Sequence, residues 1–425
     1  MAATQPPRTQ LEEDDEQVEN EQFIDPNDVA AEVPLEGDAP MDEDDEEERA
    51  DETKEDEDIQ IDENTIQHFE AHNGSVFCIS AHPTQPLAAS GGEDDLGYIW
   101  DVMHGEVVVK LTGHEDSISS IEWSFDGEMV ATGGMDGRVR IWKRVGKQDW
   151  KTWTFLTELQ GPDEITWLKW HPKGNVLLAG SNDATVWLWQ LPSGNTMQVF
   201  AGHEGPVQAG GFTPDGKRII TGDANGTLIF WDPRSPTPVW KITSSDARFG
   251  MGEGITAIST NVASTMAVVG GAEGELRVVN LAKGEVIGAL EGHKEGESVE
   301  AIEFVDWSAT NAVGGTASIV ATGATDGKIC IWDLTTMKLR TTLTHNDSIT
   351  SIHASPISTG LGHHITSSSS DKTLKTWDTR SGQLLAEHRG HRGPVLAAAV
   401  GAFQEYAYVL SAGDDGVCLV FDAKL

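Results

Sequence analysis

The chain has 425 residues, of which 69 are Asp or Glu and 29 are Lys or Arg, so that its formal net charge is −40. Binding of DNA or RNA depends on clustered Lys and Arg that contact phosphates, and the charge balance therefore disfavours a direct nucleic-acid partner. It favours instead a basic protein or a Lys/Arg-rich peptide.

The cysteines and the apolar runs indicate where such a protein works. Cys78, Cys330 and Cys418 are few and odd in number, which argues against a disulfide framework and for a reducing compartment. We find no basic segment followed by an apolar run at the N-terminus and no stretch of about 20 apolar residues, so we expect neither a signal peptide nor a membrane span. We expect a monomer in the cytoplasm, with the nucleus as the alternative compartment.

The N-terminal segment is the most acidic part of the chain. Residues 1–64 contain 27 Asp and Glu against 3 Lys and Arg. Such a segment cannot bury enough apolar surface to offset the entropy lost on ordering, and we predict a disordered acidic tail over residues 1–58. Its role is either solubility or capture of a basic partner. From Ile59 apolar residues punctuate the sequence, and we predict one folded domain over residues 59–425.

Residues 113–143 form a unit that opens with Gly-His and closes with Trp142. Between them lie three alternating runs typical of short strands, at residues 119–123, 129–132 and 138–142. A sheet of two or three such strands is marginally stable alone, so the unit must stack on copies of itself. Closing residues recur at intervals of 42 to 53 residues along the chain. They are Trp100, Trp142, Trp189, Trp231, Val279, Trp332, Trp377 and Phe421.

Other positions repeat in the same register. A turn residue precedes each closing residue by six positions: Asp94, Asp136, Asp183, Asn225, Glu273, Asp326, Asp371 and Asp415. A Ser or Thr usually lies four positions earlier still. A His opens most units, namely His72, His114, His203, His293, His345 and His391, whereas the third and fifth units lack it. Eight units of this period predict an all-β, eight-bladed β-propeller.

The Gly-His and Trp-Asp pairs, such as Trp100-Asp101, resemble the WD-repeat family over about residues 65–425. The resemblance implies that the His, Ser/Thr, Asp and Trp of each unit form an internal hydrogen-bond network. A single active site would not need the set in unit after unit, and the other enzyme motifs fail on spacing. We therefore expect no catalytic residues, no metal site and no cofactor.

The two ends of the repeat array predict how the ring closes. The last unit ends at Phe421-Asp422 and lacks a fourth strand, whereas the run from Thr65 to Phe69 precedes the first unit. Pairing this run with the last three strands would leave no open sheet edge. We therefore predict that an N-terminal strand closes the propeller.

Two units carry insertions. Residues 143–158 include Trp150, Trp153 and several Lys and Arg, which indicates either a long hairpin or a second contact surface. Residues 304–319 are rich in Gly, Ala, Ser and Thr and are typical of a loop.

Carboxylates gather in the loops before first strands and in the turns after second strands, which emerge on one face of a propeller. The candidate partner-binding residues are Glu93, Asp94, Glu115, Asp116, Glu164, Glu204, Glu253, Glu297 and Asp414. The turn Asp positions are partly structural. A ring of carboxylates would hold a basic peptide by charge-assisted hydrogen bonds; the alternative is a solvated rim that only aids solubility.

Residues 69–100 and 167–189, together with the acidic tail, resemble the family of the angio-associated migratory cell protein. That family includes the fungal dedicated chaperone of the large-subunit ribosomal protein L-ten (uL-sixteen). The resemblance implies a chaperone that binds the basic N-terminus of this newly made protein and escorts it to ribosome assembly. Two alternatives remain: a substrate receptor of a cullin ubiquitin ligase, suggested by the W-D-x-R motifs at 231–234 and 377–380, and a signalling or migration scaffold.

Overall fold

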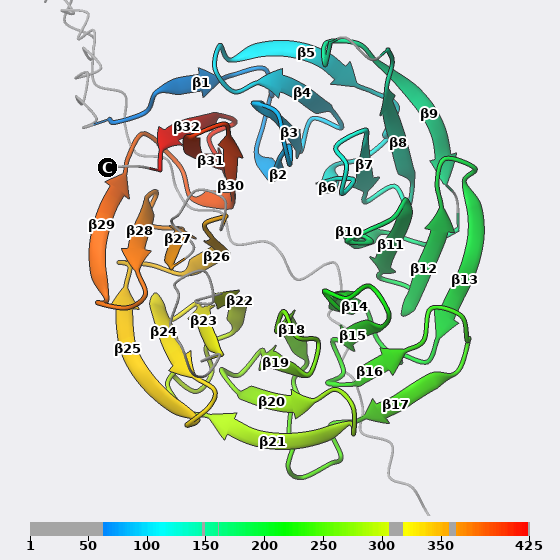
Figure 1. The fold of residues 1–425 in the computed structure, drawn as a ribbon, viewed down its shortest axis with the longest axis vertical. Coiled ribbons are helices and arrows are strands. Elements are labelled where there is room, and N and C mark those ends of the chain that lie inside the picture. Colours follow the sequence, from blue (N-terminus) through cyan, green and yellow to red (C-terminus); the bar gives the residue numbers. More distant parts are fainter. Residues whose placement is uncertain (1–62, 147–148, 160, 306–317, 357–362, 424–425) are drawn as a thin grey trace, which may run out of the picture. The chain divides into compact units, whose positions relative to one another are not determined.

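The computed structural model describes residues 63–423 except 147–148, 160, 306–317 and 357–362. All the regular secondary structure in that part of the chain is β-strand, and the strands form eight antiparallel four-stranded sheets. The sheets follow one another round a ring, as Figure 1 shows. The predicted eight-bladed propeller is therefore confirmed. The predicted acidic tail, residues 1–58, lies outside the described residues.

Each blade is a simple meander from the centre of the ring outward (Figure 1). The innermost strands are β2 (Val76–Ala81), β6 (Ile118–Trp123), β10 (Ile165–Trp170), β14 (Val207–Phe212), β18 (Ile255–Thr260), β22 (Val299–Val305), β26 (Ile349–Ala354) and β30 (Val395–Phe403). The second strands are β3 (Leu87–Gly92), β7 (Met129–Gly134), β11 (Val176–Ser181), β15 (Ile219–Asp223), β19 (Met266–Gly271), β23 (Ile319–Ala324), β27 (His364–Ser369) and β31 (Tyr406–Gly413).

The third and outermost strands complete the blades. The third strands are β4 (Gly97–Asp101), β8 (Val139–Arg144), β12 (Thr185–Gln190), β16 (Leu228–Trp231), β20 (Leu276–Asn280), β24 (Lys328–Asp333), β28 (Leu374–Asp378) and β32 (Cys418–Asp422). The outermost strands are β5 (Glu106–Leu111), β9 (Trp153–Leu159), β13 (Asn195–Ala201), β17 (Pro238–Ile242), β21 (Glu285–Leu290), β25 (Lys338–Thr344), β29 (Gln383–His388) and β1 (Gln67–Phe69).

The second strands carry the core because a neighbouring blade covers each of their faces. All six residues of β3, LAASGG, are buried, and so are those of β7 and β23. Small residues there let the blades approach, and the large closing side chains fill the space between sheets: Trp100, Trp231 and Phe421 are fully buried. Apolar burial of this kind contributes about 1.5–3 kcal/mol for each large side chain.

The ring closes as the sequence predicts. Strand β1 pairs with β32, and Phe69 lies opposite Cys418 in the register. The Phe69 ring stacks on Trp100 of the first blade, with the two centroids 4.6 Å apart and the planes within 7°. The N-terminal strand therefore belongs to the eighth blade by hydrogen bonding and to the first blade by packing. It covers the edge of β32 at the seam, as the outermost strand does in each other blade.

The meander also decides which connections share a face. In antiparallel strands, the first strand of a blade begins at the edge where the second strand ends. The loops between blades and the turns between second and third strands therefore lie on one face of the ring. The turns between first and second strands, and between third and fourth strands, lie on the opposite face.

Candidate functional site

The His, Thr, Asp and Trp of the fourth blade show what the repeated residues do. Nδ1 of His203 lies 2.9 Å from Oδ2 of Asp223, and its Nε2 lies 2.7 Å from Oγ1 of Thr221. The Trp231 indole N–H donates to the same Thr221 oxygen at 2.9 Å. The carboxylate fixes the proton on Nδ1, so the hydroxyl of Thr221 donates to Nε2 and accepts from Trp231. Every polar atom of the chain of contacts is satisfied.

The His contacts to the carboxylate and to the hydroxyl recur in five further blades, which supports the structural interpretation of the repeat. The indole bond recurs in three of them, at Trp100, Trp332 and Trp377, whereas the Trp142 N–H is buried without a partner among the described residues. The paired residues are His72 with Asp94, His114 with Asp136, His293 with Asp326, His345 with Asp371, and His391 with Asp415. Burial lowers the pKa of His72, His114 and His293, and the neighbouring carboxylates only partly oppose it. These imidazoles therefore stay neutral and hold the loop before each first strand to the turn after the second.

In the fourth blade one expected residue is wrong. The sequence register places Asn225 at the turn position, but the network uses Asp223, two residues earlier. Asp223 ends β15 and is fully buried, whereas Asn225 is exposed. Burial would raise the pKa of Asp223, but hydrogen bonds from His203 and from the Thr227 N–H lower it. Asp223 lies opposite the first residue of β14, the register position that Gly134 has in the second blade, so its carboxylate reaches His203 from the end of the strand instead of from the turn.

Two histidines on the opposite face have a role that the sequence analysis missed. Nε2 of His82 lies 3.1 Å from the Gly127 carbonyl, and Nε2 of His171 lies 3.0 Å from the Gly216 carbonyl. Each bond joins the first turn of one blade to the first turn of the next. Each histidine is followed by proline, and a His-Pro pair is typical of an ordinary turn. Only the recurrence of this pair at the same place, directly after a first strand, could have indicated the role.

The described part of the insertion at residues 143–158 extends the pairing of β8 with β9, in which Arg144 lies opposite Trp153. Trp153 is buried in the core between blades, and its ring packs edge-on against Trp123. The Trp150 ring packs against His82 and under the Arg144 guanidinium, which also pairs with Glu128. The two tryptophans are thus part of the scaffold. The second insertion, residues 304–319, falls mostly outside the described residues.

The nine predicted partner-binding residues all lie in connections on one face, which we call the acidic face. Glu115, Asp116, Glu164, Glu204, Glu253 and Glu297 lie between blades, and Glu93, Asp94 and Asp414 lie between second and third strands. The two kinds of connection meet, since the Ser75 hydroxyl donates to Asp414 across the ring seam at 2.8 Å. These residues therefore belong to one surface, although they come from five loops and two turns of the chain.

Asp94 is the least exposed of the nine residues; Glu297 is half-buried and the other seven are exposed. The Asp94 side chain is 7% exposed and binds His72 and the backbone N–H of Asn73, so its carboxylate serves the scaffold. Glu115 and Glu204 are 71% and 77% exposed. We therefore exclude Asp94 from the surface that faces a partner.

Some of the exposed carboxylates already have weak local partners. Glu115 pairs with Arg138 at 2.9 Å, and Glu297 pairs with Lys294 at 2.9 Å. The bond from Lys294 lowers the pKa of Glu297, with a further contribution from Thr325. Exposed pairs of this kind contribute roughly 0–1 kcal/mol, so an incoming Arg or Lys can replace them at small cost.

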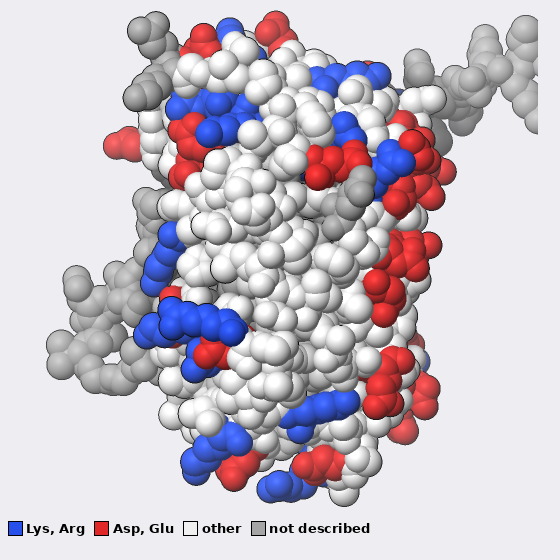
Figure 2. Space-filling model, turned by 90° about the vertical axis from the view of Figure 1, so that its right-hand side faces the viewer, with Lys and Arg blue, Asp and Glu red and all other residues white. Residues whose placement is uncertain are grey.

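Figure 2 shows the charge on the wall of the ring. Asp and Glu gather along one margin, and the outer strands between the margins are largely uncharged. Lys and Arg are more frequent toward the other margin. On this side of the ring, one margin is thus the more acidic, a distribution that would attract a basic partner to that margin.

The remaining motifs supply no competing site. Among the described residues no group of three His, Cys, Asp or Glu could hold a metal ion. In the same part of the chain no helix is long and apolar enough to span a membrane. The W-D-x-R motifs lie on the face opposite the acidic one, where Arg234 is exposed and Asp232 binds Arg218 at 2.9 Å.

Comparisons with family models support the propeller. The model described as WD domain, G-beta repeat matches residues 63–101 and 105–143. A second model, described as outer membrane protein assembly factor BamB, matches residues 136–385. The His–Asp contacts of the WD pattern continue through that second segment, at His203, His293 and His345. The WD description therefore fits the side chains of six of the eight blades, on both sides of the boundary between the two matched segments.

Similar proteins come from animals and fungi. The human angio-associated migratory cell protein is 30% identical over 367 residues, covering 83% of this chain and 79% of the relative. The ribosome assembly protein SQT1 of Saccharomyces cerevisiae is 26% identical, covering 89% and 91%. The crystal structure of Chaetomium thermophilum Sqt1 bound to the N-terminus of the ribosomal protein L10 superposes with a TM-score of 0.77 at 28% identity. It covers 85% of this chain and all of that one.

Proposed function

Because the chain belongs to the family of WD-repeat propellers that includes the angio-associated migratory cell protein, we propose that it is a dedicated ribosomal-protein chaperone. It binds the basic N-terminal segment of a newly made large-subunit protein of the L10 type and escorts it to ribosome assembly. The relatives named above are scaffold and assembly proteins, and the chain is not an enzyme. The cytoplasm, where ribosomal proteins are made, is the proposed compartment.

The observation that carries the proposal is the carboxylate-rich face, in a fold whose fungal counterpart is bound to the L10 N-terminus. The proposed contacts are Glu93, Glu115, Asp116, Glu164, Glu204, Glu253, Glu297 and Asp414. Carboxylates accept two parallel hydrogen bonds from one guanidinium, which gives Arg both affinity and a fixed orientation. Covering the basic segment would also keep it from RNA until assembly, because RNA phosphates compete for the same Lys and Arg.

Affinity purification of the tagged full-length chain from growing cells, at low salt, tests the proposal. We expect one basic ribosomal protein in stoichiometric amount, and we expect salt above about 0.5 M to release it, since screening then acts within a few ångströms. Recovery of a cullin adaptor would favour the ligase receptor. Recovery of signalling proteins without a ribosomal protein would favour the scaffold.

A further inference from the structure

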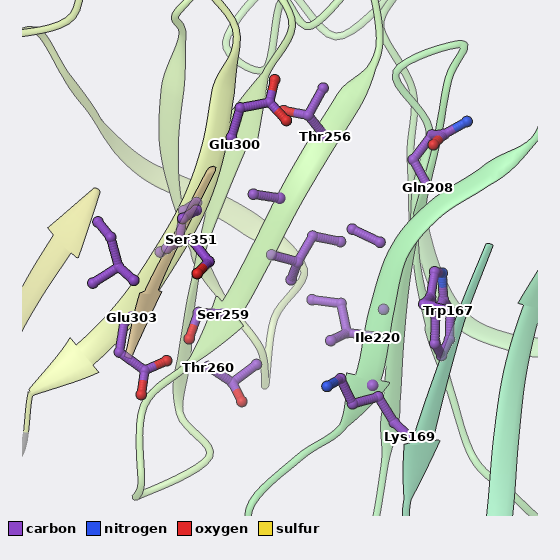
Figure 3. Close-up of a pocket in the computed structure, with 18 of the residues that line it drawn as sticks. Trp167, Lys169, Gln208, Ile220, Thr256, Ser259, Thr260, Glu300, Glu303 and Ser351 are labelled. Atoms are coloured by element: carbon purple, nitrogen blue, oxygen red, sulfur yellow. The ribbon is translucent and has the colours of Figure 1, made fainter. Parts of the chain in front are cut away.

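A cavity of about 530 Å³ lies where five consecutive innermost strands, β10, β14, β18, β22 and β26, line the channel of the ring. This volume is within the range of small-ligand sites, about 300–1,000 Å³. Figure 3 shows Trp167 and Gln208 on one wall, and Glu300 and Glu303 on the opposite wall. The wall with Glu300 and Glu303 is thus acidic, whereas the opposite wall carries the aromatic side chain of Trp167.

The cavity extends inward from the acidic face. Innermost strands begin on that face, and Glu300 is the second residue of β22, whereas Glu303 is the fifth. Three residues of an extended strand span about 10 Å, so Glu303 lies about that much deeper in the channel. Figure 3 shows Glu300 near Thr256 at one end of the cavity and Glu303 level with Thr260 and Lys169 at the other.

The charged groups in the cavity do not balance. Lys169 reaches into the channel from β10, but it forms an ion pair with Glu122 of β6. Glu303 accepts one long hydrogen bond, from the Ala354 N–H at 3.4 Å, and Glu300 is exposed at the mouth. Lys169, the one Lys or Arg among the described residues that line the cavity, thus pairs with a carboxylate outside the lining. Glu300 and Glu303 lack a close counter-ion among the described residues.

The titration of Glu303 agrees with this imbalance. Burial raises the pKa of its carboxyl to about 7, and neither the Ala354 N–H nor the more distant Lys169 compensates. His353, on the neighbouring β26, supplies no positive charge, because burial and then Lys169 lower its pKa to about 4. Near neutral pH the cavity therefore holds a carboxylate that a cation would stabilise in its ionised form.

We propose that this cavity receives one Lys or Arg side chain of the bound basic segment, with Glu300 at the mouth and the half-buried Glu303 as its counter-ion. The inference rests on the proposed function and adds a specific pocket to it. The edge of the Trp167 ring, which is largely buried between Gly180 and Gly210, would contact the alkyl part of the side chain from the opposite wall. One basic residue of the segment would thereby be fixed, whereas those on the open rim could exchange partners.

Calorimetric titration with a synthetic peptide of the ribosomal protein L10 N-terminus tests the pocket. At pH 8 we expect Glu303→Gln to weaken binding about tenfold, and at pH 6, where wild-type Glu303 is mostly protonated, we expect a difference of less than threefold. Wild type should release a proton on binding near pH 7, seen as a dependence on buffer ionisation enthalpy that the variant lacks. Ionised Glu303 opposes folding, so the variant should be at least as stable as wild type at pH 8.

A second arm identifies the side chain that enters. Each Lys and Arg of the peptide is replaced in turn by Met, and each replacement is measured against wild type and Glu303→Gln. One of the replaced peptides should bind wild type more weakly than the unchanged peptide does. The same replacement should weaken binding to Glu303→Gln only slightly, because the two changes remove the same contact. Glu106→Gln, on the outer strand β5, is the matched control for charge. Unchanged affinity and proton release in Glu303→Gln would overturn the pocket while leaving binding on the acidic face intact.

Discussion

At the scale of the residue, the repeated His, Ser/Thr, Asp and Trp stabilise the blades and do no chemistry. The sequence predicts this, because a set that recurs in register in most units cannot be a single active site. It could not locate the carboxylate of the fourth blade, since Asn225 fits the spacing, whereas Asp223 stands where the second blade has Gly134 and only the structure shows that its side chain reaches His203. Nor could it show that Asp94 is buried against His72 while its neighbour Glu93 is exposed.

Removing the buried Asp223 carboxylate should lower the stability of the fold without changing partner binding, which depends on the exposed carboxylates of the acidic face. Asp223→Ala leaves Nδ1 of His203 and the Thr227 N–H without their acceptor, and we expect a loss of about 1–3 kcal/mol in the free energy of unfolding. Asp183→Ala, in the third blade, which lacks the His, is the control: Asp183 is exposed, and its removal should cost well under 1 kcal/mol. Equal losses in urea unfolding would contradict the network account.

Acid should destabilise the ring before the carboxylates titrate. Burial lowers the pKa of His82, His353 and His388 to about 4, whereas unfolded His titrates near 6.5. Between these values the unfolded state binds more protons, so stability falls as the pH falls from about 6.5 to 4. Glu303 has the opposite effect, because its raised pKa lets the folded state bind one more proton than the unfolded state over this range, and that proton stabilises the fold as the pH falls. A free energy of unfolding that is flat over this range would refute the prediction.

At the scale of the element, the decisive contact is the pairing of β1 with β32. The sequence predicts it from a last unit that lacks one strand and an early run that has no unit. It could not predict the stacking of Phe69 on Trp100, because that contact joins two blades through packing rather than pattern. The bonds from His82 and His171 to the next blade escaped notice for the same reason.

The closure predicts how two truncations differ. Deleting residues 1–70 removes β1 and should lower the melting temperature sharply, whereas deleting residues 1–58 should leave it nearly unchanged. Phe69→Ala keeps the backbone pairing and should cost about 3–5 kcal/mol, because the Phe69 side chain is almost fully buried. If the two truncations melted alike, the strand would not be what closes the ring.

At the scale of the whole molecule, strand order alone predicts which loops share a face, and their composition predicts its charge. The channel pocket was out of reach of the sequence. Its unbalanced carboxylates depend on which innermost strands face one another, and Lys169 reads as an ordinary surface residue until its ion pair with Glu122 is seen. The central claim is that a basic segment binds the acidic face by charge.

Calorimetric titration of two double variants with the L10 N-terminal peptide tests that claim most directly. Glu93→Lys with Glu115→Lys reverses two charges on the acidic face, and Glu106→Lys with Glu285→Lys makes the same net change at exposed positions where outer strands start, toward the opposite face. We expect the first pair to weaken binding at least tenfold and the second to change it less than threefold, with melting temperatures close to wild type. Equal effects of the two pairs, or undiminished binding by the first, would contradict the account.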